Sequence, residues 1–118
     1  MSDLEGHLTR NGLLWERWVD YGVTDQTVLA VEFHFYATRE SSARRLCELL
    51  GEAGYEVTRR ATRTLLFFKG FDITATERGR WTLERLQART RQLHELGEQV
   101  GVALEGCGAE MPERPVEP

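Results

Sequence analysis

The segment 28–36, VLAVEFHFY, is rich in β-branched and aromatic side chains, and from Val31 onward its apolar and polar residues alternate. Such residues favour the pleated conformation of a strand. Its apolar positions include Val31, Phe33 and Phe35, and the positions between and beyond them carry Glu32, His34 and Tyr36. This alternation predicts a strand with one buried face and one face that carries polar side chains.

From Ala43 onward the spacing of the apolar residues changes to three and four, which is the repeat of a helix with one buried stripe. The stripe consists of Ala43, Leu46, Cys47, Leu50 and Ala53. Thr38, Ser41 or Ser42 is expected to cap the start of this helix, and Gly54 suits the left-handed residue that ends it. Strand character resumes at 55–57, so the three segments predict a strand–helix–strand unit.

The segment before this unit predicts a short helix over 12–20, which Asn11 would cap and Gly22 would end. Residues 1–9 are polar and are expected to be frayed. The short helix carries Trp15 and Trp18, and it is too short to be stable alone. The two tryptophans are expected to lie against the body of the domain, and the alternative is a docking surface for a partner.

The segment after the unit predicts an interrupted second strand over 55–68, a tight turn at Lys69-Gly70 and a third strand over 71–77. A turn at 61–63 is the competing interpretation. Residues 78–80 are expected to connect to a second long helix over 82–100, with Gly101 as its stop. A last strand is expected to start at 102–104 and to run into the glycine-containing segment 105–109.

Together these elements predict an α+β protein with the βαββαβ order of a ferredoxin-like domain, preceded by a short N-terminal helix. Two helices would cover one face of an antiparallel sheet. The other face would carry Glu32, His34 and Tyr36, and either the N-terminal helix or another molecule would cover it. The chain divides into an N-terminal helical arm (1–27), the ferredoxin-like domain (28–109) and a flexible acidic tail (110–118).

The length of 118 residues and the ordinary hydrophobic content are typical of one globular domain. The net charge of −4 argues against direct nucleic-acid binding, although Arg59, Arg60 and Arg63 form a basic cluster in the middle of the chain. No apolar run is long enough to span a membrane, and the first residues do not form a secretory signal. We therefore expect a cytoplasmic protein.

Neither an enzyme nor a cofactor site is indicated by the motifs. The histidines at 7, 34 and 94 are far apart in sequence, so neither a metal nor a cofactor is expected. Cys47 fits a helix core, and Cys107, between two glycines, has no base that the sequence can assign to it. Neither glycine-rich phosphate motif occurs. Lys69-Gly70-Phe71 opens like an RNA-recognition motif, but the following positions do not fit it.

Three segments resemble the RraB family of ribonuclease E inhibitors over about residues 28–109. VEFHFYATRESSARRLCELLGEAGYEV resembles the first strand, helix and second strand of that family. FDITATERGRWTLERLQARTRQLHELGEQVG is similar to its third strand and second helix, and VGVALEGCGAE to its closing G-x-x-Y-D-G-W-x segment. Leu104, Glu105, Gly106 and Cys107 stand where the family has Tyr-Asp-Gly-Trp, so both aromatics are replaced. The family's long acidic tail is reduced to 110–118.

The resemblance implies a ferredoxin-like fold and a non-catalytic regulator that binds ribonuclease E and lowers its activity. We expect the contact with a protein partner to use the open sheet face, the arginine cluster or the turn at 106–108. The residues concerned are Glu32, His34, Tyr36, Arg59, Arg60, Arg63, Glu105, Gly106, Cys107 and Gly108. The alternative is a small dimeric enzyme or ligand-binding module, with His34 and Tyr36 in a cavity and the sheet as the dimer interface.

Overall fold

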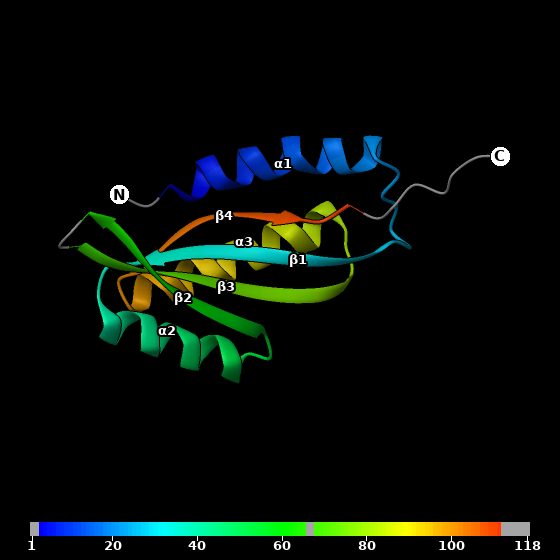
Figure 1. Cartoon of the computed structure of the whole chain (residues 1–118). Coiled ribbons are helices and arrows are strands. Elements are labelled where there is room, and N and C mark those ends of the chain that lie inside the picture. The colour runs from blue at the N-terminus through cyan, green and yellow to red at the C-terminus, as the bar shows by residue number, and fades with distance from the viewer. Residues whose placement is uncertain (1–2, 66–67, 112–118) are drawn as a thin grey trace.

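The computed structural model describes residues 3–65 and 68–111, with the side chains of residues 64, 65, 68 and 69 outside the description. Three helices and four strands follow one another in this part of the chain (Figure 1). They are α1 (Leu4–Asp20), β1 (Val28–Ala37), α2 (Glu40–Glu52), β2 (Glu56–Leu65), β3 (Phe68–Arg80), α3 (Leu83–Gln99) and β4 (Ala103–Ala109).

The four strands form one sheet in the order β2-β3-β1-β4, and each neighbouring pair is antiparallel. Because β1 and β2 both pair with β3, the strand–helix–strand unit from β1 to β2 leaves room for β3 between its two strands. Helices α2 and α3 lie against the same face of the sheet (Figure 1). The predicted α+β class with an antiparallel sheet is confirmed.

The core lies between the sheet and these two helices. On β1 the buried positions alternate as predicted, with Val31, Phe33 and Phe35 at most 1% exposed. The helical stripe of α2 also faces inward, through Ala43, Leu46 and Leu50. Trp81, between β3 and α3, is the largest fully buried side chain, and its ring lies 6.1 Å from that of Phe33. Burial of this apolar surface is the main stabilising term for the fold.

Helix α1 starts earlier than predicted. It begins at Leu4 after Asp3, so residues 4–9 are helical rather than frayed, and Asn11 is a buried residue inside the helix rather than its cap. The predicted stop is confirmed, because Gly22 takes a positive φ of 101° directly after the helix. The tryptophans lie against the body as expected: Trp18 is 3% exposed and Trp15 is partly buried beside it.

The predicted turns of the hairpin are wrong. Residues 61–63 and Lys69-Gly70 lie within β2 and β3, where Thr62 pairs with Gly70. The connection falls at 66–67, outside the described residues. The segment 78–80 belongs to β3, and 106–108 belongs to β4 instead of a turn. In addition, α2 begins at Glu40, with Arg39 rather than a threonine or serine at the cap position.

A partly buried ion-pair cluster joins β3 to α3. Glu77 of β3 accepts hydrogen bonds from Arg85 and Arg89 of α3, each at 2.8 Å. Burial by itself raises the pKa of Glu77, but the hydrogen bonds from Arg89 and Arg85 outweigh it and hold that pKa below its ordinary value. The Arg85 guanidinium also lies 4.4 Å from the Trp81 ring centre, so the cluster fixes how α3 packs on the sheet.

Candidate functional site

The face of the sheet away from α2 and α3 carries polar side chains from three strands. The register aligns them in rows across the sheet: Thr58, Thr74, His34 and Gly106 form one row, and Arg60, Asp72 and Tyr36 form the next. A third row holds Glu56, Thr76, Glu32 and Gly108. We define the open sheet face by Glu32, His34, Tyr36, Thr58, Arg60, Asp72 and Thr74.

His34 stands in the middle of the open sheet face. Its ring Nδ1 lies 3.3 Å from the Thr74 hydroxyl, and the side chain is exposed. A solvent-open depression of about 390 Å³ surrounds it, lined by His34, Phe35, Thr58, Arg60, Asp72, Ile73, Thr74 and Glu105. Phe35 and Ile73 behind it are almost fully buried in a filled core. The described residues therefore form a shallow polar surface here and no closed apolar cavity.

Tyr36 is held flat on the sheet by a glycine. A side-chain carbon added at Gly70 would lie 1.8 Å from the Tyr36 hydroxyl oxygen, so the phenol ring passes directly over Gly70. Gly70 is buried as a result, while Tyr36 stays partly exposed. The glycine that the sequence suggests as a turn residue instead allows the close approach of an aromatic ring, which is the other common reason for glycine in a strand.

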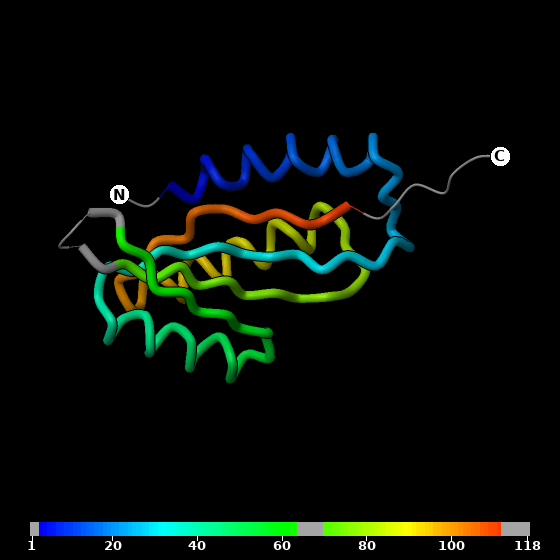
Figure 2. Tube along the Cα trace, viewed as in Figure 1, coloured from blue at the N-terminus to red at the C-terminus, as the bar shows by residue number. Residues whose placement is uncertain are grey.

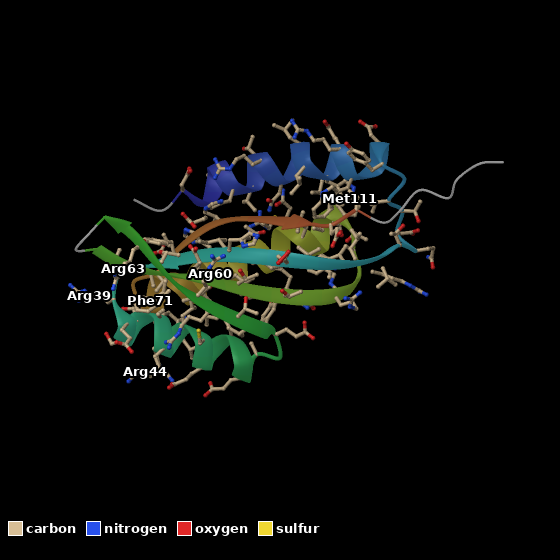
Figure 3. All side chains as sticks on the ribbon, viewed as in Figure 1. Arg39, Arg44, Arg60, Arg63, Phe71 and Met111 are labelled. Carbon is tan, nitrogen blue, oxygen red and sulfur yellow. The ribbon has the colours of Figure 1, made fainter. Side chains whose placement is uncertain are left out.

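The predicted arginine cluster is divided between the two faces of the sheet. Arg60 pairs with Asp72 and therefore lies on the open sheet face, whereas Arg59 pairs with the buried Ile73 and points to the other side. The Arg59 guanidinium lies 5.5 Å from the centre of the Phe71 ring. Figure 3 shows Arg39, Arg63 and Phe71 at the end of the molecule where α2 begins. Only Arg60 of the cluster thus joins His34 and Tyr36.

Strand β4 contributes both to the open sheet face and to the interior. A bulge between His34 and Phe35 of β1 displaces Glu105, which borders the depression near His34. Cys107 points the other way and donates a hydrogen bond to the Asn11 side-chain oxygen at 3.3 Å. Burial raises the pKa of the Cys107 thiol to about 11, so the thiolate that nucleophilic chemistry needs is not populated at neutral pH.

A buried polar network that the sequence analysis missed attaches α1 to the body. Asn11 donates hydrogen bonds to the Thr90 hydroxyl at 2.8 Å and to Gln87 at 3.0 Å, and Gln87 donates to the Leu8 carbonyl. The spacing of positions 7, 11 and 18, which are four and then seven residues apart, could have predicted that they share one buried helix face. A search for apolar residues misses this pattern, because His7 and Asn11 are polar.

His7 and His94 meet at the N-terminal end of α1, with ring centres 6.4 Å apart. Burial lowers the pKa of His7, and the nearby Arg10 cation lowers it further. Arg10 donates to His7 Nδ1 at 3.0 Å, which requires that nitrogen to be unprotonated because a guanidinium only donates.

Among residues 3–65 and 68–111, no three potential ligands gather in an arrangement that could hold a metal. None of the described helices is sufficiently long and apolar to cross a bilayer.

Comparison with known proteins gives one family. The sequence model of the family described as RraB, regulator of ribonuclease activity B, matches residues 11–109. The match begins within α1 and ends at the last residue of β4, so it contains the whole sheet, α2 and α3. No curated protein matches the chain.

Proposed function

The chain belongs to the RraB family of regulators of ribonuclease activity, and from this premise we propose that it binds a ribonuclease and modulates RNA degradation without catalysing a reaction itself. Ribonuclease E is the first partner to test, because the sequence resembles its inhibitors. A regulator of RNA degradation acts where transcripts are cleaved, so the proposed role implies the expected cytoplasmic location.

The observation that carries the proposal is the exposed polar surface on the matched part of the chain. The open sheet face combines side chains from β1, β2 and β3, and no helix of the described residues covers it (Figures 1 and 2). His34, Tyr36 and Arg60 offer an imidazole, a phenol and a guanidinium on a rigid backbone. Tyrosine and arginine, together with tryptophan, are the residue types enriched among the residues that dominate binding at protein interfaces.

The shape of this surface favours a binding protein over the alternative of a small enzyme. A small-molecule site is usually a concave, mostly apolar pocket that buries most of its ligand. The depression at His34 opens to solvent, and the side chains behind it fill the core.

The strand order and the two helix-containing connections also support a ferredoxin-like classification with an added N-terminal helix, which we propose as the finer description of the fold.

The experiment is an RNA cleavage assay with purified ribonuclease E, in which the chain is titrated and its affinity is measured in parallel. We expect the double substitution Tyr36→Ala and Arg60→Glu to weaken binding at least tenfold, because it removes the aromatic contact and reverses the charge on the open sheet face. Arg91→Glu is the matched control: Arg91 is exposed on α3 and lies away from that face.

Inhibition of cleavage by the unmodified chain and the Arg91→Glu variant, but not by the double variant, would support both the partner and the surface. Equal inhibition by all three would remove the open sheet face as the contact. A chain that neither binds the ribonuclease nor changes its cleavage rate would contradict the proposed function.

A further inference from the structure

We propose that the groove between α1 and β4 receives an extended acidic segment of a partner protein, which adds to the sheet as a short fifth strand beside 105–109. The proposal rests on the proposed function only for the identity of that partner, which would be the ribonuclease. The geometry of the groove and its charges determine the kind of segment.

Helix α1 lies beyond the edge of the sheet. Strand β4 is the last strand of the order β2-β3-β1-β4, and α1 packs on α3 and runs along the outer side of β4 (Figures 1 and 2). Neighbouring strands are about 4.8 Å apart and packed helices about 10 Å, so two helices suffice to cover four strands. A third helix therefore extends past the sheet, and its outer side has no strand beneath it.

The space beside β4 is a groove of about 420 Å³, lined by Arg10, Leu13, Leu14, Arg17, Glu105, Gly106 and Cys107. The four α1 residues are spaced three, four and seven apart, so they form one stripe of the helix. The stripe is apolar in the middle, and Leu13 is 59% exposed although it is a large apolar side chain. Such a side chain at a groove is a surface that a partner can bury.

The outer backbone of β4 is available to a further strand. His7 forms a hydrogen bond with the backbone of Leu104, at the start of the strand. From Glu105 to Ala109, no backbone hydrogen bond other than those with β1 occurs among the described residues. A side-chain carbon added at Gly106 or Gly108 would meet nothing within 4 Å. An extended peptide can therefore approach this edge and use its N–H and C=O groups, as in β-strand addition.

The charges of the groove favour carboxylates in the partner. Arg10 and Arg17 stand at the two ends of the apolar stripe, about 10 Å apart along the helix. No ion pair of Arg17 occurs within the described residues. Arg10 donates a hydrogen bond to His7, and its pair with Asp3 is long, at 3.5 Å, and exposed; both contacts use one guanidinium nitrogen, so the other N–H groups remain for a carboxylate. Glu105 is the sole carboxylate of the lining. Two acidic residues four apart in a strand lie on one face about 13 Å apart, which the long arginine side chains can reach, and an apolar residue midway between them would face the leucines.

The other free edge does not offer the same features. Strand β2 is exposed at 58–61 and 63 and carries arginines toward both faces, which is how natural sheets guard an edge against pairing. A second copy of the chain is also a poor occupant of the β4 edge. Symmetric pairing of two β4 strands would bring two α1 helices, each with Arg10 and Arg17, into the same space.

The test is an NMR titration of the ¹⁵N-labelled chain with the heptapeptide Thr-Glu-Thr-Val-Thr-Glu-Thr at millimolar concentration. We expect the largest amide shifts at 105–109 of β4 and 10–17 of α1. The peptide Thr-Lys-Thr-Val-Thr-Lys-Thr is the charge-reversed control and should bind at least tenfold more weakly. Single-stranded oligouridylate is titrated separately.

The variant Leu13→Asp should lose acidic-peptide binding at least tenfold, because it removes the apolar centre of the stripe and adds a repelling charge. Its matched control is Val19→Asp on the same helix, since Val19 is 50% exposed and lies outside the groove lining. Shifts confined to β2, equal binding of both peptides, or stronger binding of the oligouridylate at the groove would each overturn the proposal.

The same two variants separate this inference from the proposed function. If Leu13→Asp binds ribonuclease E as tightly as Val19→Asp does, the groove is not its contact, and the proposed function stands without it. If the acidic peptide binds the groove but the chain has no effect on the ribonuclease, the groove stands and the proposed partner is wrong.

Discussion

At Gly97 the backbone of α3 is packed so closely that only glycine fits. A side-chain carbon there would lie 2.5 Å from the Val102 carbonyl oxygen and 3.3 Å from the Phe35 ring. The carbonyl belongs to the backbone and cannot move aside without shifting the approach to β4. Gly97 lies on the buried side of α3, and this contact gives the physical reason for its small size.

We therefore expect Gly97→Ala to lower the free energy of unfolding by about 1–3 kcal/mol, as overpacking does. Gly51→Ala in α2 is the matched control, because nothing lies within 4 Å of the added carbon. It should raise the free energy of unfolding by about 0.5–1 kcal/mol through helix propensity. Urea unfolding followed by circular dichroism measures both, and equal effects would refute the packing argument.

At the scale of the elements, the docking of α1 depends on buried polar groups as well as on its tryptophans. Asn11 hydrogen-bonds to Thr90 and Gln87 of α3, and His7 is only 6% exposed next to Leu104 of β4. Buried polar groups stabilise a particular arrangement only while they remain paired. The docking of α1, and with it the groove beside β4, therefore depends on Asn11 and His7 keeping their hydrogen-bond partners.

Burial and the Arg10 cation lower the pKa of His7 below its ordinary value of 6.5. As the pH falls through 6.5, His7 therefore binds a proton in the unfolded chain more readily than in the folded protein. The free energy of unfolding should consequently fall as the pH drops below 6.5. Urea titrations between pH 7.5 and 5 measure this dependence. The variant His7→Gln should show a smaller fall over the same range, whereas an unchanged slope would exclude His7 as its source.

At the scale of the whole molecule, α1 and the sheet share one core. Trp18 and Val23 belong to the same buried cluster as Phe33, Leu86 and Leu104. A cluster that spans the N-terminal helix, the sheet and α3 favours cooperative unfolding of the chain as one unit. The division at residue 27 into an arm and a domain, which the sequence suggests, stays a prediction that unfolding experiments can decide.

The tryptophans allow a direct measurement of this cooperativity. In a Trp81→Phe variant the remaining tryptophans, Trp15 and Trp18, both lie in α1, so their fluorescence reports on that helix alone. We expect the fluorescence transition in urea to coincide with that of far-ultraviolet circular dichroism, which reports on all elements. A fluorescence change at lower urea concentration would show that α1 is a separable arm.

Local patterns in the sequence determined the elements and the class of the fold. The two-residue alternation in β1 and the three- and four-residue spacing in α2 follow from which face each element buries, so they are readable without the structure. The helix stops at Gly22, Gly54 and Gly101 were also readable from the sequence, because a helix often ends in a residue with a positive φ and glycine adopts that conformation most easily.

Only the tertiary structure decided where residues distant in sequence meet. The sequence could not show that Gly70 lies under Tyr36, that Arg59 and Arg60 face opposite sides, or that Asn11 binds Thr90, because each depends on register or on contacts across the fold. The open sheet face and the groove beside β4 arise from the same cause. A strand fixes the alternation of its own side chains, but the neighbouring strands and helices determine which of them share a surface.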